Sequence, residues 1–394
     1  MFKKSIFAVF GFCAVLSAQD FDTFLYEALQ ASPYLKANAL EIERADEQSN
    51  VIQRYKNPKL SLEASKFTPD LGKSEAGYRV ALMQPVRLWG VGKDRTNLAA
   101  ATRAEAKGLV TLQHAEFVKV LSLLYVEYMT ESALLRLARE EFLISKNIAN
   151  ISRERYEAGT IAKVKYLRAK VDLTSSKNLL NEKKAMRLAS YYKLLAFAGL
   201  QNEKELDDNY VFRLSDKMQK EEIQNSSAEL YYLKTQQNTA NAKARLNANK
   251  IQWMNVYAAY EAEPDQSIAR VGMNIPLALF NTKKEEQRIA VLQAKQSEFL
   301  LQNQKTALSR NIERLKKELN ILRAVVGSTQ DLYNAQKELL KMYEDGYKIA
   351  NINLLELQNI KNQMIQTKEK KIILENKINR NIVLYNYEVG EYNE

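Results

Sequence analysis

Cysteine and histidine are almost missing from this chain of 394 residues, which contains one of each, Cys13 and His114. One cysteine cannot close an internal disulfide, and the two residues cannot build a thiolate metal centre or a catalytic cysteine–histidine pair. The nearest approach to a phosphate loop, Gly90-Val91-Gly92-Lys93-Asp94, lacks the first glycine and has Asp94 where serine or threonine is needed. We therefore expect no enzyme activity, no catalytic residue, no cofactor and no bound metal.

Proline is also scarce, and it is confined to two windows. The six prolines lie between Pro33 and Pro85 and between Pro264 and Pro276, so residues 86–263 and 277–394 contain none. Since proline breaks helices, such stretches can form very long helices when they are rich in Ala, Leu, Lys and Glu. Helices are predicted at about residues 21–54, 93–155, 164–197, 226–250, 283–344 and 353–387.

Apolar residues in these segments recur at spacings of three and four, which is typical of helices packed side by side. The seam of the first long helix contains Leu121, Leu124, Tyr128, Leu135, Ala138 and Phe142, and that of the last helix contains Leu357, Ile360, Met364, Leu374, Ile378 and Tyr385. Polar residues interrupt both seams, namely Glu131, Thr367, Lys371 and Asn381. Narrow, interrupted seams favour a wall of helices over one thick core.

Long hydrophobic runs are missing after the N-terminus. Residues 1–18 read as a secretory signal peptide, with basic Lys3 and Lys4, an apolar stretch from Ile6 to Leu16 and a small-residue exit at Ala18. A lipoprotein signal at Cys13 is the alternative, disfavoured by the bulk of the preceding residue. Export makes nucleic acid an improbable partner despite the net charge of +11. No later segment has the ~20 consecutive apolar residues of a membrane helix, although a barrel strand needs only ~9–11.

The two proline windows carry the alternation of a β-strand, with apolar side chains at every second residue. Two hairpins are predicted, at about residues 59–84 and 255–276. Their apolar positions are Leu60, Leu62, Ala64, Tyr78, Val80 and Leu82 in the first and Val256, Ala258, Tyr260, Ala262, Val271, Met273 and Ile275 in the second. The fold class is therefore mainly α with a small β part.

The chain is an internal tandem repeat. The segment from Arg79 to Lys93 recurs 191 residues later, and Tyr156-Glu157-Ala158-Gly159 recurs as Tyr343-Glu344-Asp345-Gly346. Each repeat is one architectural unit. The predicted units are residues 19–200 and 226–394, separated by a joint at 201–225. Gly159 and Gly346 are expected at the turn of each long helix hairpin, because glycine tolerates the left-handed backbone that follows a helix.

Two hairpins supply only four strands, which cannot close into a barrel. An open edge in lipid leaves backbone groups unsatisfied at several kcal/mol each, and the smallest membrane barrels have about eight strands. If the hairpins enter a membrane, more than one chain must contribute, and three chains would give twelve strands.

This layout resembles the outer-membrane efflux protein family typified by TolC, the outer membrane factors of tripartite efflux systems. The resemblance rests on the order and duplication of Gln84-Pro85-Val86-Arg87-Leu88-Trp89-Gly90 and the two glycine tips. It implies a homotrimer in the outer membrane of a Gram-negative bacterium, embedded in outer-membrane lipid. A twelve-stranded β-barrel would continue into an α-helical tunnel across the periplasm. A periplasmic adaptor (membrane fusion protein) and an inner-membrane pump, of the resistance-nodulation-division or ATP-driven type, would dock on it.

The resemblance also implies site residues. Ala158, Gly159, Thr160, Asp345 and Gly346 would meet the adaptor, and Glu356, Asn359 and Tyr347 would fall at the periplasmic gate. Asn359 departs from the family's acidic pattern, and Ile352 stands where an arginine is expected. Three copies of Glu356 around one axis would form a ring attractive to cations. The alternative is that Glu356 is an ordinary solvated helix residue.

Several uses of such a duct stay open. The short chain and the segment from Pro85 to Lys93 resemble the heavy-metal efflux branch more than the multidrug channels. The exported substrates would be metal cations or drugs. The duct could instead serve type I protein secretion, or the chain could be a periplasmic coiled-coil protein without a pore. Trp89 and Trp253 flank the hairpins, where they would either mark a membrane interface or pack at the junction of strand and helix.

Overall fold

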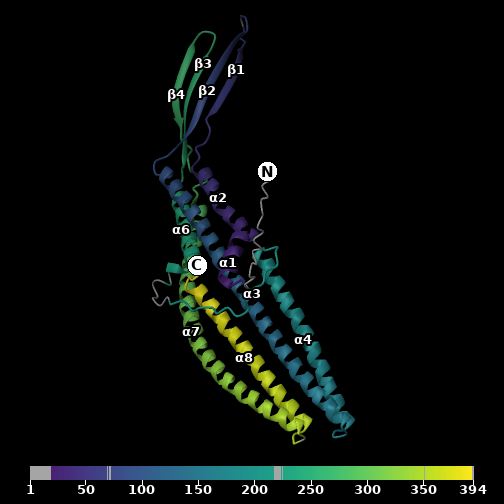
Figure 1. Ribbon diagram of the computed structural model, residues 1–394. Coiled ribbons are helices and arrows are strands. Elements are labelled where there is room, and N and C mark those ends of the chain that lie inside the picture. Colours follow the sequence, from purple (N-terminus) through teal and green to yellow (C-terminus); the bar gives the residue numbers. More distant parts are fainter. Residues whose placement is uncertain are drawn as a thin grey trace, which may run out of the picture.

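The computed structural model describes residues 19–392 apart from residues 69, 71, 217–222, 224 and 350. The predicted signal peptide, residues 1–18, lies outside the described residues. Figure 1 shows a long molecule with a β-sheet at one end and two helical hairpins at the other. The elements are α1 (Phe21–Ala31), α2 (Pro33–Gln53), β1 (Lys59–Phe67), β2 (Glu75–Arg87), α3 (Val91–Glu157), α4 (Lys163–Ala198), α6 (Ala228–Ala248), β3 (Trp253–Ala262), β4 (Ser267–Asn274), α7 (Lys284–Lys348) and α8 (Leu354–Glu388).

The proline-free stretches form very long helices. Helix α3 has 67 residues and α7 has 65, which makes each of them about 100 Å long at 1.5 Å per residue. Helix α3 packs against α2, α4, α6 and α8, and α7 packs against α6 and α8. The helices therefore form a wall, as the narrow seams predict. By length and composition, helix α3 also contains one stretch that is long and apolar enough to cross a membrane, and 39% of that stretch is buried inside the protein.

The first predicted helix, residues 21–54, is divided in two, and the prediction of one helix was wrong. Helix α1 ends at Ala31, and Pro33 is the first residue of α2. Ser32 between them has non-helical backbone angles and caps α2 with its side chain. A residue before proline is pushed out of the helical region, and proline is well tolerated at the first helical position. The break lets α1 turn into the middle of the molecule.

An aromatic cluster fills the middle of the molecule, where α1 meets α3. The ring of Phe21 lies 4.9 Å from that of Tyr125 and 5.1 Å from that of Phe212, and Phe24 is fully buried. The Tyr125 hydroxyl donates to the carbonyl of Asp207 in the joint between the repeats, at 2.6 Å. This cluster anchors the joint to the first long helix.

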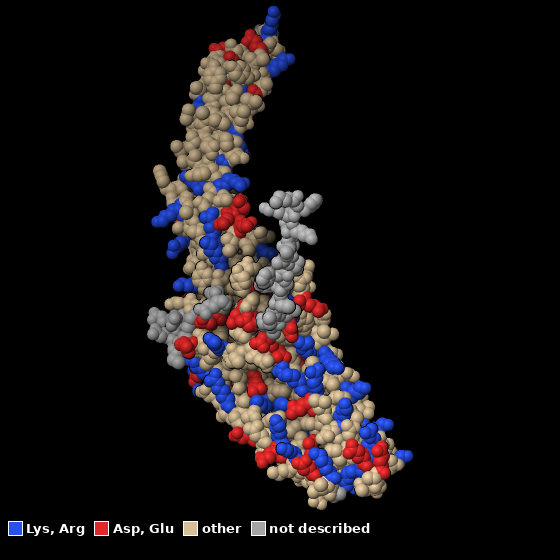
Figure 2. Space-filling view, in the orientation of Figure 1, with Lys and Arg blue, Asp and Glu red and all other residues tan. Residues whose placement is uncertain are grey.

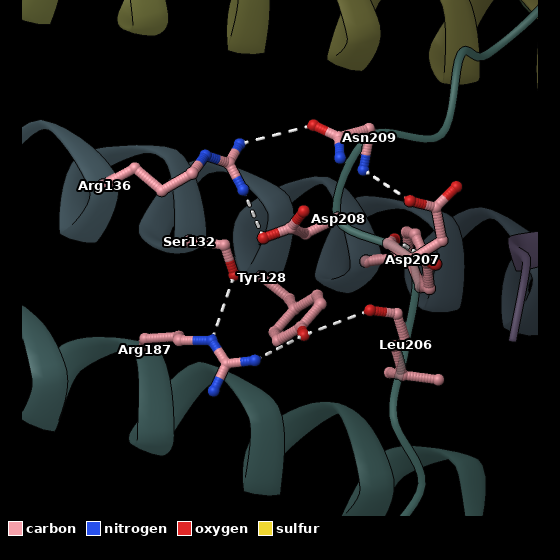
Figure 3. A network of polar contacts seen from close by, with 9 residues as sticks. Tyr128, Ser132, Arg136, Arg187, Leu206, Asp207, Asp208 and Asn209 are labelled. Atoms are coloured by element: carbon pink, nitrogen blue, oxygen red, sulfur yellow. Dashed lines mark hydrogen bonds and ion pairs between the residues drawn. The ribbon is translucent and has the colours of Figure 1, made fainter. Parts of the chain in front are cut away.

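Polar contacts hold the same joint further along α3 (Figure 3). Arg136 pairs with Asp208, and Asn209 donates its backbone N–H to the Asp207 carboxylate at 2.9 Å. From α4, Arg187 donates to the hydroxyl of Tyr128 at 2.9 Å. The joint is thus a strap across α3 and α4 rather than a free linker.

All four strands pair in one antiparallel sheet, in the order β1-β2-β3-β4. The two hairpins meet along β2 and β3, where Val80 faces Tyr260 and Leu82 faces Ala258. Strands β1 and β4 are the edges, each paired on one side only within the chain. The sheet stands clear of the helices, with little charge on its surface compared with the helical body (Figure 2).

One face of the sheet is mainly apolar. The registers place the even-numbered residues of β1, β2 and β3 and the odd-numbered residues of β4 on this face. Its exposed members include Leu60, Leu62, Tyr78, Val80, Leu82, Val256, Tyr260, Val271 and Met273. The opposite face carries ion pairs, Arg79 with Glu63 at 3.6 Å and Arg270 with Glu261. A broad apolar face open to solvent marks a surface that another phase or partner must cover.

Two helical glycines allow a matched test of helix packing. A Cβ on Gly108 of α3 would lie 2.7 Å from the Thr235 hydroxyl and 3.2 Å from the Tyr232 Cα of α6, whereas a Cβ on Gly327 of α7 would meet nothing within 4 Å. We expect Gly108→Val to lower the free energy of unfolding by about 1–3 kcal/mol through overpacking. We expect Gly327→Ala to raise it by about 1 kcal/mol through helix propensity. Thermal unfolding followed by circular dichroism measures both, and equal shifts would contradict the close approach of α3 and α6.

Candidate functional site at the helix tips

The two helical hairpins turn at the same end of the molecule, opposite the sheet (Figure 1). At the first tip, α3 ends at Glu157, and Gly159 has a left-handed φ of 72°. Gly159 N donates to Tyr156 O at 2.9 Å and Thr160 N to Arg155 O at 2.8 Å, the two bonds of a Schellman cap. Ala158, Gly159 and Thr160 are all exposed, so the first tip offers backbone and small side chains to solvent.

The second tip is built differently, although its sequence is the duplicate of the first. Helix α7 continues past Gly346 to Lys348, so the prediction that Gly346 takes a left-handed turn was wrong. A Cβ at Gly346 would lie 2.7 Å from the Ile352 side chain. The carbonyl of Gly346 accepts the N–H groups of Asn351 (3.0 Å) and Ile352 (3.3 Å). Glycine is needed here because the returning chain packs directly on the helix, and Asp345 beside it is exposed.

Tyr347 is buried and joins the two hairpins. Its hydroxyl lies 2.8 Å from the hydroxyl of Ser152 on α3. Arg155 donates to its backbone carbonyl at 2.7 Å and lies over its ring, 4.7 Å from the centroid. Tyr347 is therefore a contact between α7 and α3 and is 1% exposed, not a free side chain near the tip.

Glu356 and Asn359 lie on the exposed side of α8. Asn353 is the N-cap of α8 and accepts from Glu356 N at 3.0 Å, while its own amide donates to the Glu356 carboxylate at 2.6 Å. The Asn353 side chain therefore caps the first turn of α8, and the Glu356 carboxylate holds that side chain in place. Both Glu356 and Asn359 are exposed, and the same side of α8 continues with polar Gln363 and Gln366. Glu356 thus has a structural task whatever else it does.

A buried ion pair, not predicted from the sequence, ties α8 to the first hairpin. Lys361 of α8 is 0% exposed, and its Nζ lies 2.7 Å from both carboxylate oxygens of Asp172 on α4 and 3.0 Å from the Ser145 hydroxyl on α3. Glu141 is more distant, at 3.9 Å. Burial raises the pKa of Glu141 despite the attraction of Lys361, so Asp172 is the main partner.

No feature of the sequence marks Lys361 as different from its neighbours. Lys361 occupies a seam position four residues after Leu357, much as Lys371 occupies a seam position further along. Lys371, however, forms a partly exposed pair with Glu375 at 3.3 Å. Only the approach of α4, 189 residues earlier in the chain, supplies the carboxylate. In the part of the chain that the structure describes, no three His, Cys, Asp or Glu side chains come together as a metal site.

At the sheet end, the structure separates the two tryptophans. Trp89, after β2, is 97% exposed, and Phe280, its counterpart after β4, is 100% exposed. Trp253 is half-buried and packs edge-on against Tyr55, with 6.2 Å between the ring centroids. Trp253 therefore packs at the strand–helix junction, and only Trp89 stands free.

The geometry as a whole defines a class of protein. A four-stranded sheet with one exposed apolar face and two edges unpaired within the chain is joined to two long helical hairpins. Residues 24–200 match the sequence family described as outer membrane efflux protein. The matched segment is the first of the two repeats and makes up a little under half of the chain, so the match shows that this repeat is similar to the family. No curated protein matches the chain.

Solved structures share the fold over nearly the whole chain. A structure of CusC superposes with a TM-score of 0.79 at 13% identity, covering 94% of this chain and 91% of that one. The outer membrane protein VceC of Vibrio cholerae gives 0.78 at 13% identity, covering 94% and 95%. The CmeC outer membrane channel of Campylobacter jejuni gives 0.77 at 13% identity, covering 94% and 85%. At such low identity these likenesses establish the fold alone.

The buried ion pair gives a test of how the hairpins are held together. We expect Asp172→Asn to lower the free energy of unfolding by about 3–5 kcal/mol, because it leaves the Lys361 ammonium buried without its main counter-charge. The double variant Asp172→Leu with Lys361→Met should recover most of that loss. Lys371→Met removes a partly exposed pair within one helix and should cost less than about 1 kcal/mol. Chemical unfolding measures all three, and a small loss for Asp172→Asn alone would contradict the importance of the pair.

Proposed function

We propose that three copies of this chain form a passive duct that crosses the outer membrane and continues through the periplasm. The observation that carries the proposal is the sheet, with its exposed apolar face, its ion-paired opposite face and its two open edges. The apolar face suits lipid, and the opposite face suits a water-filled lumen. The duct performs no chemistry, and the energy for export comes from a partner in the inner membrane.

The number of copies follows from the edges and the width of the lumen. In lipid, the free N–H and C=O groups of β1 and β4 need partners, which neighbouring copies supply. Two copies would give eight strands, and a barrel of about eight strands is filled by its own side chains. Three copies give twelve strands and leave room for cargo. Because the four strands are connected in sequence to α2, α3, α6 and α7, the helices would line the continuation of the same axis.

The exposed aromatic residues beside the sheet fit a membrane interface. Trp89 and Phe280 lie at equivalent positions of the two repeats, each just after a hairpin and just before a long helix. Aromatic side chains are enriched where lipid headgroups meet water. These two residues would fix the depth at which the sheet ends and the periplasmic helices begin.

At the far end, the exposed tips would receive the adaptor. The first tip offers Ala158, Gly159 and Thr160, and the second offers Asp345, all of them open to solvent. Gly346 and Tyr347 would shape the second tip from within rather than touch the partner. The gate would be the place where the polar side of α8, with Glu356 and Asn359, approaches its copies around the axis.

Glu356→Gln tests the gate without disturbing the start of the helix. The backbone N–H of residue 356 still donates to Asn353, and the glutamine side-chain oxygen can still accept from the Asn353 amide, so only the charge is removed. In planar bilayers, we expect the wild-type duct to prefer cations and Glu356→Gln to lose part of that preference. Glu157→Gln, an exposed carboxylate at the other tip, is the matched control and should leave ion preference unchanged. An unchanged preference in Glu356→Gln would leave this residue only its structural contact with the N-cap residue Asn353. No conductance from the wild-type protein would refute the duct itself.

The exported substrate is tested in a strain that lacks this gene. Accumulation of divalent metals and of amphipathic dyes is compared side by side, and secreted proteins are assayed in the same cultures. Selective metal retention identifies a metal-efflux duct, and dye sensitivity identifies a drug-efflux duct. Loss of a secreted protein with normal handling of both identifies type I secretion. Recovery of the protein in the soluble periplasmic fraction would instead favour a coiled-coil protein without a pore.

A further inference from the structure

Positive charge is concentrated where the sheet meets the helices. Figure 2 shows Lys and Arg gathered at the lower end of the mostly uncharged sheet. Three cations surround the Trp253 ring, with Lys56 Nζ at 5.1 Å, the Arg87 guanidinium at 5.4 Å and that of Arg95 at 5.2 Å from its centroid. Arg87 also stacks on Tyr55 at 4.0 Å. Lys283 lies next to this group, at the start of α7. We refer to Lys56, Arg87, Arg95 and Lys283 as the junction cations.

Neutral groups hold the two arginines. Arg87 donates to the backbone carbonyl of Gln53, and Arg95 donates to that of Ile52 at 2.8 Å and to the side chain of Gln252 at 3.2 Å. The carbonyls belong to the end of α2, where a helix attracts positive charge. These contacts position the guanidinium groups without neutralising them.

No carboxylate among the described residues forms an ion pair with a junction cation. The nearby acids are Asp94, which accepts from Asn249 at 2.7 Å, and Glu286, which lies in the first turn of α7. The ammonium groups of Lys56 and Lys283 donate no hydrogen bond to a described residue. The end of α2 accounts for the arginines, but it does not account for the lysines.

The junction cations lie close enough to repel one another, and the pKa values of two of them are lowered. Burial and repulsion by Arg87 lower the pKa of Arg95. Burial, and then repulsion by Arg95 and Lys56, lower the pKa of Lys283 although Glu286 opposes the change. Lys283 also has a left-handed φ of 56°, and it is the one described residue other than glycine with a positive φ. Backbone strain of this kind is concentrated at functional sites.

The sheet register shows which way the cluster faces. Arg87 and Trp253 are partners across β2 and β3. Both lie on the face that carries the Arg79–Glu63 ion pair, opposite the apolar face. In the proposed duct this polar face is the lumen, so the junction cations line the passage where the barrel joins the helical tunnel.

We infer that the junction cations form an anion-binding site in the lumen, which holds solutes bearing a carboxylate, sulfonate or phosphate group in transit. Guanidinium and ammonium groups that no carboxylate neutralises are strong donors to such oxygen atoms. Three copies around one axis form a positive ring at the sheet end of the duct, complementary to the Glu356 ring proposed at the tips. The inference rests on the proposed function only for its placement in the lumen.

Trp253 reports on the site directly. The chain has two tryptophans, so Trp89→Phe leaves Trp253 as the single reporter. In detergent-solubilised Trp89→Phe protein, we compare quenching by iodide, an anion, with quenching by neutral acrylamide. Removing two charges with Lys56→Gln and Lys283→Gln should lower the iodide-to-acrylamide ratio about two- to fourfold, given screened Coulomb interactions over a few ångströms. Lys56→Arg with Lys283→Arg should keep the ratio.

Two exposed lysines at the other end of the sheet give a control matched in charge. Lys66→Gln with Lys73→Gln changes the net charge equally but leaves the junction intact, and it should leave the ratio unchanged. An unchanged ratio in the Lys56 and Lys283 glutamine variant, or an equal fall in this control, would overturn the site. Circular dichroism verifies that each variant is folded.

Two further experiments identify the chemical class of the bound anion and the location of the site. Inorganic phosphate should protect Trp253 from iodide, whereas protection by phosphatidylglycerol alone would assign the cluster to lipid headgroups and overturn the luminal site. In bilayers, the glutamine variant should shift the reversal potential in a KCl gradient toward cation preference. No conductance would refute the duct, but it would not alter the quenching result, so the two ideas fail separately. Conductance with an unshifted potential would remove the cluster from the lumen.

Discussion

The open edges of a four-stranded sheet are the constraint on which the rest of this structure depends. One face of the sheet is apolar and exposed, yet β1 and β4 have unpaired backbone groups. In lipid those groups must be satisfied, because no water is available to bond them. A single copy of this chain is therefore an incomplete object, and the proposed trimer follows from hydrogen bonding as much as from the likeness to known channels. Because the helices are joined to the sheet, they would be arranged around the same threefold axis.

Because the chain is an internal duplication, each half supplies the same set of elements to the sheet and to the helical wall, and the two halves differ only in detail. Each repeat supplies a hairpin, an exposed aromatic residue after it and a long helix that returns at a tip. The tips have diverged: Gly159 provides a left-handed cap, whereas Gly346 stays helical and makes room for Ile352. The second helical hairpin also contacts the first helical hairpin, formed by α3 and α4. The contacts are made by Tyr347 near the turn and by Lys361 further along α8. If the second hairpin moves during opening, these contacts are the ones it must exchange.

Charge is used differently at the two ends of the molecule. At the tips the interior cation Lys361 is paired with Asp172, and the exposed side of α8 carries Glu356 near the amides Asn359, Gln363 and Gln366. At the sheet end, neutral acceptors hold Arg87 and Arg95, and no described carboxylate forms an ion pair with any of the four junction cations. A duct with opposite charge at its two ends would pass solutes of either sign while slowing each at one place. Such weak, separated sites suit conduction, which requires release as well as binding.

The sequence by itself determined the local elements. Proline placement gave the long helices, alternation gave the strands with their apolar face, and the repeat predicted two hairpins and two tips, because each of these patterns is a property of near neighbours. Contacts between distant segments were decided only by the tertiary structure. The seam lysine Lys361 is paired because α4 brings Asp172 beside it, and Lys371, with the same pattern, is not buried. Gly346 and Gly159 share a motif, but only the packing of Ile352 makes one of them helical. The cluster around Trp253 combines residues from α3, β2, β3 and two loops, and no short-range pattern could have assembled it.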